Sequence, residues 1–338
     1  MTVKAVLYGV GPIGALIGRA AIHKGVEIVG AIDIDPVKTG KDLGAVIGLD
    51  EKTGIRVNED ADAVLSKAKP DVVLHATGSF LDKVYPQLVK AITYGANVVS
   101  TCETLAYPYY RYPQLAEKLD GYARSKKVSV LGCGINPGFI LDLLPSVMTL
   151  PLVELKGISA RRSLNASRRR LSFQRKIGLG LDLGEWNRLI SQGKITGHVG
   201  YAESVHLMAA ALGLRIREVE ERQEPIIAEK DVSAHGLSIR KGSVAGVKGV
   251  GRGICENGVE VIVELIASVD AEDYEEIALL GEPEIRWRSN GIPGDIATAA
   301  VVVNMIPSVL EADPGLITIS DLVPSWRIMK GSVAPSKL

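Results

Sequence analysis

The first 135 residues alternate short apolar runs with segments of helical spacing. Val3–Tyr8 is an uninterrupted run of β-forming residues, and Ile13–His23 places apolar and small residues at the period of a helix. The same pattern predicts strands at Glu27–Ile34, Asp71–Ala76, Ala96–Ser100 and Val128–Leu131 and helices at Lys83–Tyr94 and Tyr109–Lys126. Strands that alternate with helices indicate βαβ units, so this part of the chain predicts a parallel sheet with helices on its faces.

The pattern changes near Leu152, where long segments of alternating apolar and polar residues replace the short runs. The predicted strands are Leu152–Arg162, Leu237–Val250, Val259–Val269 and Tyr274–Leu280, and the predicted helices are Leu183–Gln192 and Tyr201–Leu212. Glycine-containing turns separate the later strands, which is typical of an antiparallel meander. Residues 294–311 predict one last helix, which begins with Gly294-Asp295 as a cap.

A glycine motif follows the first predicted strand and opens the first predicted helix. Its residues are Gly9, Val10, Gly11, Pro12, Ile13 and Gly14. Gly9 permits a tight turn, Gly11 lets the backbone approach a pyrophosphate, and Gly14 lets helix and strand pack closely. Asp33 stands 19 residues after Gly14, where the second strand should stop, and it would accept hydrogen bonds from the adenosine ribose. These features predict a dinucleotide site; a glycine-rich turn in an unrelated α/β fold is the alternative.

The acidic residues after the second strand bear on the choice of cofactor. A carboxylate at Asp33 favours NAD over NADP, because it repels the 2′-phosphate of NADP. Asp35 adds to that repulsion, whereas Lys38 and Lys41 could compensate for it. We therefore expect an NAD(P) cofactor, with NAD favoured.

Two further strand ends carry small and polar residues. Thr77-Gly78 follows the strand at Asp71–Ala76, and Asn136 lies in the constrained turn after Val128–Leu131. The carboxyl ends of strands face the ligand crevice in a doubly wound sheet. We therefore expect Thr77, Gly78 and Asn136 beside the cofactor, although an ordinary turn would use the same residue types.

Together these patterns predict an α/β protein with a Rossmann-type doubly wound parallel sheet, followed by an α+β domain with a mainly antiparallel sheet. We divide the chain into a dinucleotide-binding domain (1–147), a substrate and dimerisation domain (148–290), and a C-terminal helix and segment (291–330) that returns to the first domain. The alternating strands at 237–280 leave one sheet face in need of cover, which predicts a homodimer.

Charge and composition argue against several classes of partner. The 338 residues include 39 Lys and Arg and 39 Asp and Glu, a net charge of zero, so neither a nucleic-acid binder nor a polybasic membrane-surface protein is expected. Asn304 and Pro307 interrupt the apolar run Ile296–Leu310, so no membrane span is expected, and the first residues lack the pattern of a secretory signal. Three scattered cysteines and five histidines predict the reducing cytoplasm and no metal site.

Glu103 is the candidate catalytic residue. It follows the strand Ala96–Ser100, so it should lie at the ligand-binding edge of the sheet, near the nicotinamide. A carboxylate there can act as a general base or hold an ammonium or iminium ion, and a surface loop acid is the alternative. The neighbouring Cys102 has no basic residue adjacent in sequence, which favours a packed thiol over a nucleophile.

Four residues are candidates for the substrate pocket: Phe139, Arg161, His198 and Thr298. Phe139 is either a pocket wall or a core residue. Arg161 begins a basic stretch that extends to Lys176. One of its arginines up to Arg170 could bind a substrate carboxylate, while most would be solvated or in subunit contact. His198 lies in a glycine-flanked loop. Thr298, in the first turn of the last helix, could meet the nicotinamide carboxamide or the substrate, or the turn could be a plain cap.

Eight motifs between about residues 3 and 326 occur together: GVGPIG, AIDID, ATGS, TCET, GCGINPGFILDLLP, FQRKIGLG, GHVGYAES and GDIATAAVVVN. With them the sequence resembles the family of 2,4-diaminopentanoate dehydrogenases and native amine dehydrogenases, whose members are often labelled dihydrodipicolinate-reductase-like. The resemblance implies a Rossmann domain, a C-terminal domain with the dimer interface, and NAD(P)-dependent interconversion of a primary amine with a ketone plus ammonia. It also implies that Glu103 is the catalytic acid that binds the ammonia or amine, and that Phe139 limits the pocket.

Other functions stay open at this point. A dihydrodipicolinate reductase is not expected, because the adjacent histidine pair of that family is absent. An enzyme like aspartate or homoserine dehydrogenase is an alternative by architecture, and so is an NAD(P)-binding sensor without turnover. A diamino-acid substrate needs partners for its carboxylate and its ammonium group, whereas a simple alkyl amine needs neither. For an amine substrate no metal is required, because the Glu103 carboxylate can stabilise a developing iminium ion.

Overall fold

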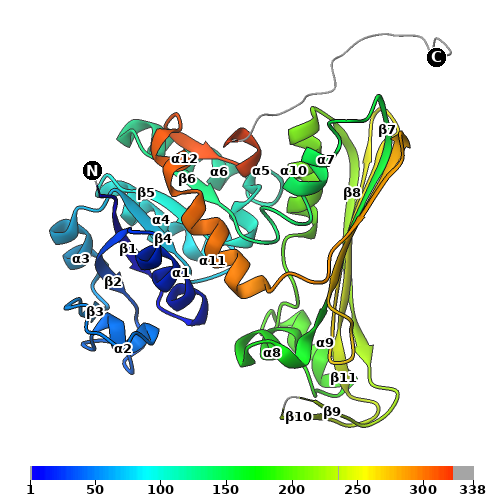
Figure 1. Ribbon diagram of the computed structural model, residues 1–338, viewed down its shortest axis with the longest axis horizontal. Helices are drawn as coiled ribbons and strands as arrows, with labels where there is room; N and C mark the ends of the chain where they lie inside the picture. The colour runs from blue at the N-terminus through cyan, green and yellow to red at the C-terminus, as the bar shows by residue number, and fades with distance from the viewer. Residues whose placement is uncertain (1, 235, 323–338) are drawn as a thin grey trace.

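The computed structural model describes residues 2–234 and 236–322. Residues 323–330, which we assigned to the returning C-terminal segment, and the tail from residue 331 lie outside the described residues. Two large sheets lie side by side, with helices between them (Figure 1). The space where the two sheets face each other holds the site described below.

The first sheet has seven strands in the order β15-β6-β5-β4-β1-β2-β3, and every pair is parallel. They are β1 Lys4–Tyr8, β2 Glu27–Ile32, β3 Val57–Asn58, β4 Val72–His75, β5 Asn97–Ser100, β6 Ser129–Gly132 and β15 Gly315–Ile317. β1 has β2 on one side and β4 on the other, which makes it the switch point at which such sheets bind ligands. The prediction of a doubly wound parallel sheet is confirmed.

Helices cover both faces of the first sheet (Figure 1). They are α1 Pro12–His23, α2 Leu43–Ile47, α3 Ala61–Ala68, α4 Leu81–Thr93, α5 Pro108–Arg111, α6 Pro113–Lys126, α11 Gly294–Asn304 and α12 Ile306–Glu311. Ala5 and Leu7 of β1 pack with α1, α11 and α12, whereas Val6 packs with α4 and α6 on the other face. Burial on both faces explains why this strand is an uninterrupted apolar run.

The first half differs from the prediction at the helix near Tyr109 and at α2, β3 and α3, which were not predicted. The helix expected at Tyr109–Lys126 is two helices, because Pro113 disfavours helical dihedrals at Tyr112, whose φ and ψ are −135° and 55°. Helix α3 was not predicted, and among its eight residues only Ala61 and Leu65 are buried. So short an apolar face leaves little periodic signal in the sequence.

The second sheet has six strands in the order β14-β13-β7-β12-β11-β8. They are β7 Glu154–Asn165, β8 Ile216–Ile227, β11 Val244–Cys255, β12 Glu260–Ser268, β13 Tyr274–Glu282 and β14 Ile285–Arg288; a separate ribbon pairs β9 Val232–Ala234 with β10 Leu237–Ile239. The β7–β12 pair is parallel and the other four pairs are antiparallel. The prediction of a mainly antiparallel sheet is confirmed.

The predicted meander has the wrong strand order, because β7 lies between β12 and β13. β7 places Ile158 and Ala160 in the core and is therefore suited to a central position, whereas β8 is rich in charged residues and takes the edge. The strand predicted at Leu237–Val250 is also interrupted. A turn with Gly242 at a φ of +84° separates β10 from β11.

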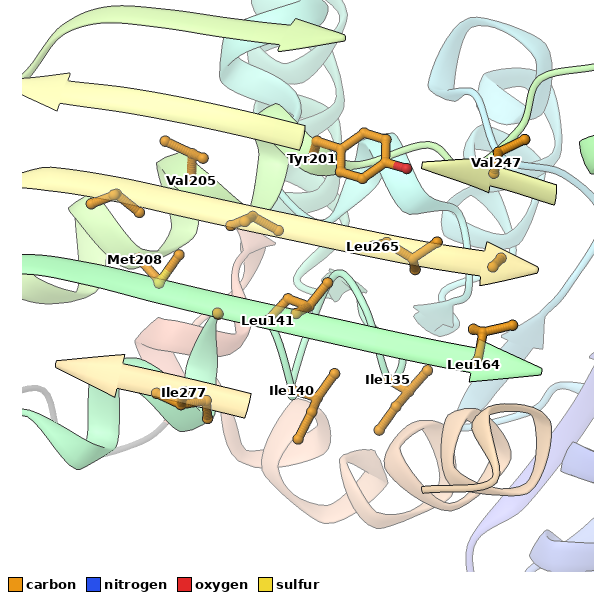
Figure 2. Close-up of a cluster of buried hydrophobic side chains, with 14 of the residues drawn as sticks. Ile135, Ile140, Leu141, Leu164, Tyr201, Val205, Met208, Val247, Leu265 and Ile277 are labelled. Atoms are coloured by element: carbon orange, nitrogen blue, oxygen red, sulfur yellow. The ribbon is translucent and has the colours of Figure 1, made fainter. Parts of the chain in front are cut away.

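One face of the second sheet is covered by α7 Leu143–Met148, α8 Leu171–Ile177, α9 Leu183–Ser191 and α10 Tyr201–Leu212 (Figure 1). Figure 2 shows Tyr201 and Val205 of α10 against Leu265 of β12 in this core. Glycines on β11 allow α10 to pack closely against this strand, because a Cβ added at Gly249 would lie 2.1 Å from the Tyr201 hydroxyl oxygen. The glycine-rich sequence of β11 is thus a consequence of helix packing.

The predicted last helix is two helices, α11 and α12, which meet at Met305. Pro307 in the first turn of α12 lacks the N–H that a continuous helix would use. Of the described residues, the run Gly294–Glu311 alone is long and apolar enough to span a membrane. Its residues Ala299 and Val302 belong to the core that contains α1, which accounts for the apolar composition. Beyond α12 the chain joins the first sheet, where β15 pairs with β6.

Candidate active site

A cavity of about 400 Å³, here called the cleft, lies between the carboxyl ends of the first sheet's strands and the helices α8 and α11. Most of the predicted site residues line it: Gly11, Pro12, Ile13, Thr77, Gly78, Glu103, Asn136, His198 and Thr298. Two predicted pocket residues, Phe139 and Arg161, are not part of its lining. The sequence therefore predicted most of the residues that line the cleft, but not those that take the places expected for Phe139 and Arg161.

The glycine motif forms a tight turn between β1 and α1. Gly9 has a φ of +91°, and a Cβ at Gly14 would lie 1.9 Å from the Gly9 carbonyl oxygen, so neither position tolerates a side chain. At Gly11 a Cβ would meet nothing within 4 Å, which leaves open space above the backbone. No side chain caps the N-terminus of α1. The turn therefore fits a pyrophosphate, with room above Gly11 and free N–H groups that point at it.

Asp33 lies just beyond β2, beside the glycine turn. Its carboxylate accepts hydrogen bonds from the N–H groups of Val10 and Asp35 at 2.8 and 2.9 Å, and Nζ of Lys38 lies 3.0 Å away. Burial acts to raise the pKa of Asp33, but these hydrogen bonds and the charge of Lys38 outweigh it and lower the pKa. Asp33 is thus an ionised carboxylate in position for a ribose hydroxyl.

A buried histidine supports the turn after β4. Thr77 is exposed, and its hydroxyl lies 2.8 Å from Nε2 of His75, while Nδ1 of His75 lies 2.8 Å from the Ser100 hydroxyl. Burial lowers the pKa of His75 to about 4, so the ring is neutral. His75 was not a predicted site residue, because a histidine at the end of an apolar strand looks like an ordinary core position.

Glu103 begins a short helical turn, η1 Glu103–Leu105, directly after β5. Its Oε1 lies 2.9 Å from Nζ of Lys176 on α8, and the same ammonium group donates to the Ser79 hydroxyl at 3.2 Å. Burial acts to raise the pKa of Glu103, but Lys176 outweighs it, and the pKa lies below its ordinary value. The neighbouring Cys102 is buried, which raises its pKa to about 12 and leaves it a thiol. Of these two neighbours, the Glu103 carboxylate is therefore the ionised group.

His198 stands beside this ion pair in the cleft. Burial and then the charge of Lys176 lower the pKa of His198 to about 3, so the imidazole is neutral. Its Nε2 lies 3.5 Å from the amide nitrogen of Asn136, and its ring makes an edge contact with Tyr201 at 4.9 Å. The oxygen of Asn136 accepts a hydrogen bond from Arg162. These contacts fix both predicted residues in the wall.

Arg161 faces away from the cleft. It pairs with Glu264 at 2.5 Å on the uncovered side of the second sheet, whereas its neighbour Arg162 is buried and lines the cleft. The reason is the period of the strand, because successive side chains of β7 point to opposite faces. Arg169 and Arg170 also line the cleft. The arginine stretch was recognised in the sequence, but the choice of Arg161 within it was wrong.

Phe139 packs against the core of the second domain, and Phe173 of α8 provides the aromatic wall of the cleft instead. Thr298 lies in the first turns of α11, where its hydroxyl oxygen accepts from the N–H of Ile135 at 3.4 Å. Lys176 was missed because it is 73 residues from Glu103 and no local pattern links the two.

Comparison with known proteins identifies the family of this chain. A family model described as the 2,4-diaminopentanoate dehydrogenase C-terminal domain matches residues 139–335. The 2,4-diaminopentanoate dehydrogenase of Acetoanaerobium sticklandii is 33% identical over 343 residues, which cover 97% of this chain and 95% of that protein. The chain belongs to the 2,4-diaminopentanoate dehydrogenase family. The resemblance found in the sequence motifs is thereby confirmed, and the chain is a member of a dehydrogenase family.

Two amine dehydrogenases also match along nearly their whole length. An amine dehydrogenase of Streptomyces virginiae is 23% identical, and the match covers 95% of this chain and 96% of that protein. The structure of an amine dehydrogenase from Mycobacterium smegmatis is similar to this one with a TM-score of 0.88 at 26% identity, over 96% of this chain and 97% of that one. Both sheets are therefore shared with that structure.

Replacement of Lys176 by methionine should raise the pKa of the Glu103 carboxyl above its ordinary value, because burial then acts without the counter-charge that lowers it. Carboxyl ¹³C shifts of glutamate-labelled protein, followed against pH, measure this pKa, and Glu103→Gln identifies the resonance. Lys176→Arg keeps the positive charge and is the matched control. A carboxyl that still titrates at low pH in Lys176→Met would show that another group keeps it ionised.

Proposed function

We propose that the chain is an NAD(P)-dependent amine dehydrogenase that interconverts a primary amine with a ketone and ammonia. The observation that carries the proposal is the Glu103 carboxylate, which is held ionised by Lys176 in the same cleft as the glycine turn. Two relatives are named as dehydrogenases of 2,4-diaminopentanoate and of amines, which supports a CH–NH₂ donor for this chain as well. A substrate related to 2,4-diaminopentanoate follows from the same names.

The first domain has the groups that a dinucleotide cofactor requires. The turn from Gly9 to Gly14 and the N-terminus of α1 would hold the pyrophosphate, and Asp33 would hold the adenosine ribose. Thr77 and Gly78 line the adjoining part of the cleft, where the nicotinamide half would lie. A bound nicotinamide supplies the hydride acceptor for deamination and the hydride donor for reductive amination.

The carboxylate of Glu103 suits the charge that develops on the substrate. When the C–H bond of a neutral amine breaks and its electron pair leaves with the hydrogen as hydride, the nitrogen becomes part of a cationic iminium group. The ionised carboxylate stabilises this cation. His198 adds no opposing charge, because its imidazole is neutral. Lys176 holds the carboxylate at the cleft, where it would face the reacting nitrogen of a bound amine.

Hydrolysis of the iminium group then needs proton transfers that Glu103 can perform. Its carboxylate accepts a proton from the attacking water, which forms a carbinolamine, and returns this proton to the nitrogen, which leaves as ammonia. The remaining hydroxyl proton passes to the carboxylate and then to solvent as the ketone forms. One side chain thus acts first as a base and then as an acid.

The exchange of Glu103 for glutamine should lower kcat for amine oxidation by about 10²- to 10⁴-fold, because the amide neither carries the charge nor exchanges the proton. Steady-state formation of NADH from 2,4-diaminopentanoate measures the loss, and fluorescence titration should show an unaltered Kd for NADH. Turnover equal to wild type would contradict the role of Glu103. Wild-type protein that binds NADH but oxidises no amine would favour the sensor function.

We also propose that NAD is the favoured cofactor. Asp33 and Asp35 place two carboxylates at the ribose end of the site, and Lys38 pairs with both, at 3.0 and 3.3 Å. One lysine does not balance two carboxylates, so the 2′-phosphate of NADP would meet net negative charge.

The variant Asp33→Asn should therefore lower kcat/KM with NAD by about ten- to a hundredfold, the range expected for one hydrogen bond to a charged group. The loss with NADP should be smaller, so the ratio of the two kcat/KM values should fall. The exposed carboxylate of the same domain in Asp50→Asn serves as a control. A wild-type preference for NADP would overturn the assignment of Asp33.

We further propose that the chain forms a homodimer through the uncovered face of its second sheet. None of the described helices covers this face, which looks away from the first domain (Figure 1). It carries apolar residues such as Ile262 and Ile266 in register with paired charges, including Arg161 with Glu264. A second copy of the same face would bury the apolar residues and enclose the ion pairs.

Light scattering at micromolar concentration should accordingly give the mass of a dimer, and Ile262→Asp on the uncovered face should shift it towards the monomer. A buried, unpaired carboxylate at a subunit interface costs several kcal/mol, which is of the order of a thousandfold in Kd. Ile22→Asp changes an exposed isoleucine in the first domain and should leave the mass unaltered. A monomeric wild-type protein would refute the dimer.

A further inference from the structure

His75 is a buried polar residue next to both of the turns that the proposed reaction uses. It is the last residue of β4, it is fully buried, and it pairs in the sheet with Tyr8 of β1 and Ser100 of β5. The Thr77–Gly78 turn follows β4, and the turn that carries Glu103 follows β5. The proposed proton transfers at Glu103 do not use this imidazole, so its place between the two turns needs another explanation.

Each ring nitrogen of His75 has one defined role. Nε2 lies 2.8 Å from the side-chain oxygen of Gln87, which only accepts hydrogen bonds, so Nε2 carries the proton of the neutral ring. Nδ1 is then an acceptor, and the Ser100 hydroxyl, 2.8 Å away, donates to it. A charged imidazolium would donate at both nitrogens, but burial lowers the pKa of the ring to about 4 and removes that alternative.

The Ser100 side of the ring reaches the turn of Glu103. The Ser100 hydroxyl oxygen accepts a hydrogen bond at 3.1 Å from the backbone N–H of Cys102, the residue before Glu103. The backbone carbonyl oxygen of His75 accepts another at 3.0 Å from the N–H of Thr101. His75 therefore holds the backbone from which Glu103 projects, once directly and once through Ser100.

The other side of the ring fixes the rotamer of Thr77. The Nε2–H group of His75 also lies within 2.8 Å of the Thr77 hydroxyl oxygen, and that hydroxyl donates to Gln87 at 2.5 Å. With its hydroxyl engaged in this way, Thr77 presents its methyl carbon to the glycine turn, 2.8 Å from the place that a Cβ on Gly9 would take. The nicotinamide-facing turn thus packs on the turn that would hold the pyrophosphate.

Thr104 joins the backbones of the same two turns independently of His75. Its N–H donates to the carbonyl oxygen of Ser79 at 3.1 Å, and its hydroxyl accepts from the N–H of Leu81 at 2.8 Å. These bonds do not involve the side chain of Thr77, so they leave its rotamer to His75. They also keep the two turns together when His75 is replaced.

We propose that His75 is a positioning residue, which acts through Thr77 and Ser100 to fix the nicotinamide-facing turn and the Glu103 turn relative to each other. Hydride transfer requires the nicotinamide and the reacting carbon at close approach, and Glu103 would hold the nitrogen on that carbon. A shift of one turn against the other would therefore slow the transfer. The assignment rests on the proposed amine dehydrogenase activity and extends it to a buried residue outside the cleft lining.

Two small changes separate the two sides of this network. Thr77→Val keeps a methyl group at the glycine turn and removes the hydroxyl, whereas Ser100→Ala removes the link to Cys102. Thr77→Val should raise the Kd for NADH, and Ser100→Ala should lower kcat for 2,4-diaminopentanoate, each by about two- to tenfold, the range for one neutral hydrogen bond. The Kd for NADH should stay that of wild type in Ser100→Ala.

Replacement of His75 itself should combine both effects. His75→Phe keeps an aromatic ring at Tyr8 and removes both nitrogens, so kcat should fall and the Kd for NADH should rise. Because His75 acts on the cofactor through Thr77, the addition of Thr77→Val to His75→Phe should raise the Kd no further. In His75→Gln the side-chain amide can take the place of Nε2, so this variant should recover the Kd but not kcat. A residue that only stabilised the fold would produce neither this split nor this rescue.

His206→Phe is the matched control. This second neutral histidine stacks between Tyr107 and Tyr110, outside the cleft lining, and its replacement should leave kcat and the Kd for NADH unaltered. The position of the ring proton is a separate test, because it depends on which end of the Gln87 amide faces His75. Long-range ¹H–¹⁵N spectra should show His75 protonated at Nε2 at neutral pH, and His75→Gln identifies its signals.

The contrary results are equally definite. A proton at Nδ1 of His75 would leave Thr77 without its donor and overturn the proposal. Increases in the Kd for NADH that multiply in the double variant would show that His75 does not act through Thr77, and wild-type values of kcat and Kd in His75→Phe would refute any positioning role. Wild-type protein that binds NADH but oxidises no amine would instead overturn the proposed function, while the NADH titrations would still judge the Thr77 side.

Discussion

The candidate site depends on the contact between Glu103 and Lys176, which come from different parts of the fold. Glu103 follows β5 of the first sheet, and Lys176 lies on α8, which packs on the second. The group that lowers the pKa of this carboxyl therefore reaches it only when the two sheets are docked correctly. A second interdomain pair supports that docking: Arg111 of α5 contacts the fully buried Glu203 of α10 at 2.8 Å. A buried carboxylate without its partner is costly, so this pair disfavours other arrangements of the two domains.

The cleft uses burial and pairing to give different charges to neighbouring groups. Burial makes the imidazoles of His75 and His198 neutral, with pKa values of about 4 and 3. Pairing with Lys176 keeps Glu103 anionic in the same surroundings. An amine that becomes a cationic iminium thus meets one negative charge and no opposing imidazolium. Besides Lys176, the positively charged side chains of the cleft are Arg162, Arg169 and Arg170.

Local pattern was sufficient for much of the fold. The period of the apolar residues identified the parallel sheet and four long strands of the second sheet, because a strand or helix that packs on a core must repeat its apolar residues at a fixed interval. The charged edge strand β8 was not predicted. The glycine turn was equally readable, since Gly9 and Gly14 have no room for a Cβ. The strand order of the second sheet could not be predicted from the sequence. β7 lies between β12 and β13, and only the packing of the whole sheet decides that position.

The sequence by itself determined which residue types surround the cleft: a glycine turn with Asp33, a carboxylate at a strand end, and a stretch of arginines. These features are local, because each follows directly from the end of one strand or the start of one helix. Only the tertiary structure decided which of them meet. In the structure Arg162, Arg169 and Arg170 line the cleft, whereas Arg161 does not. Phe173 provides the aromatic wall that was predicted for Phe139, and Lys176 pairs with Glu103. The reason is that the direction of a side chain and its long-range partners depend on strand register and on the docking of two sheets, neither of which leaves a signal in a short segment of sequence.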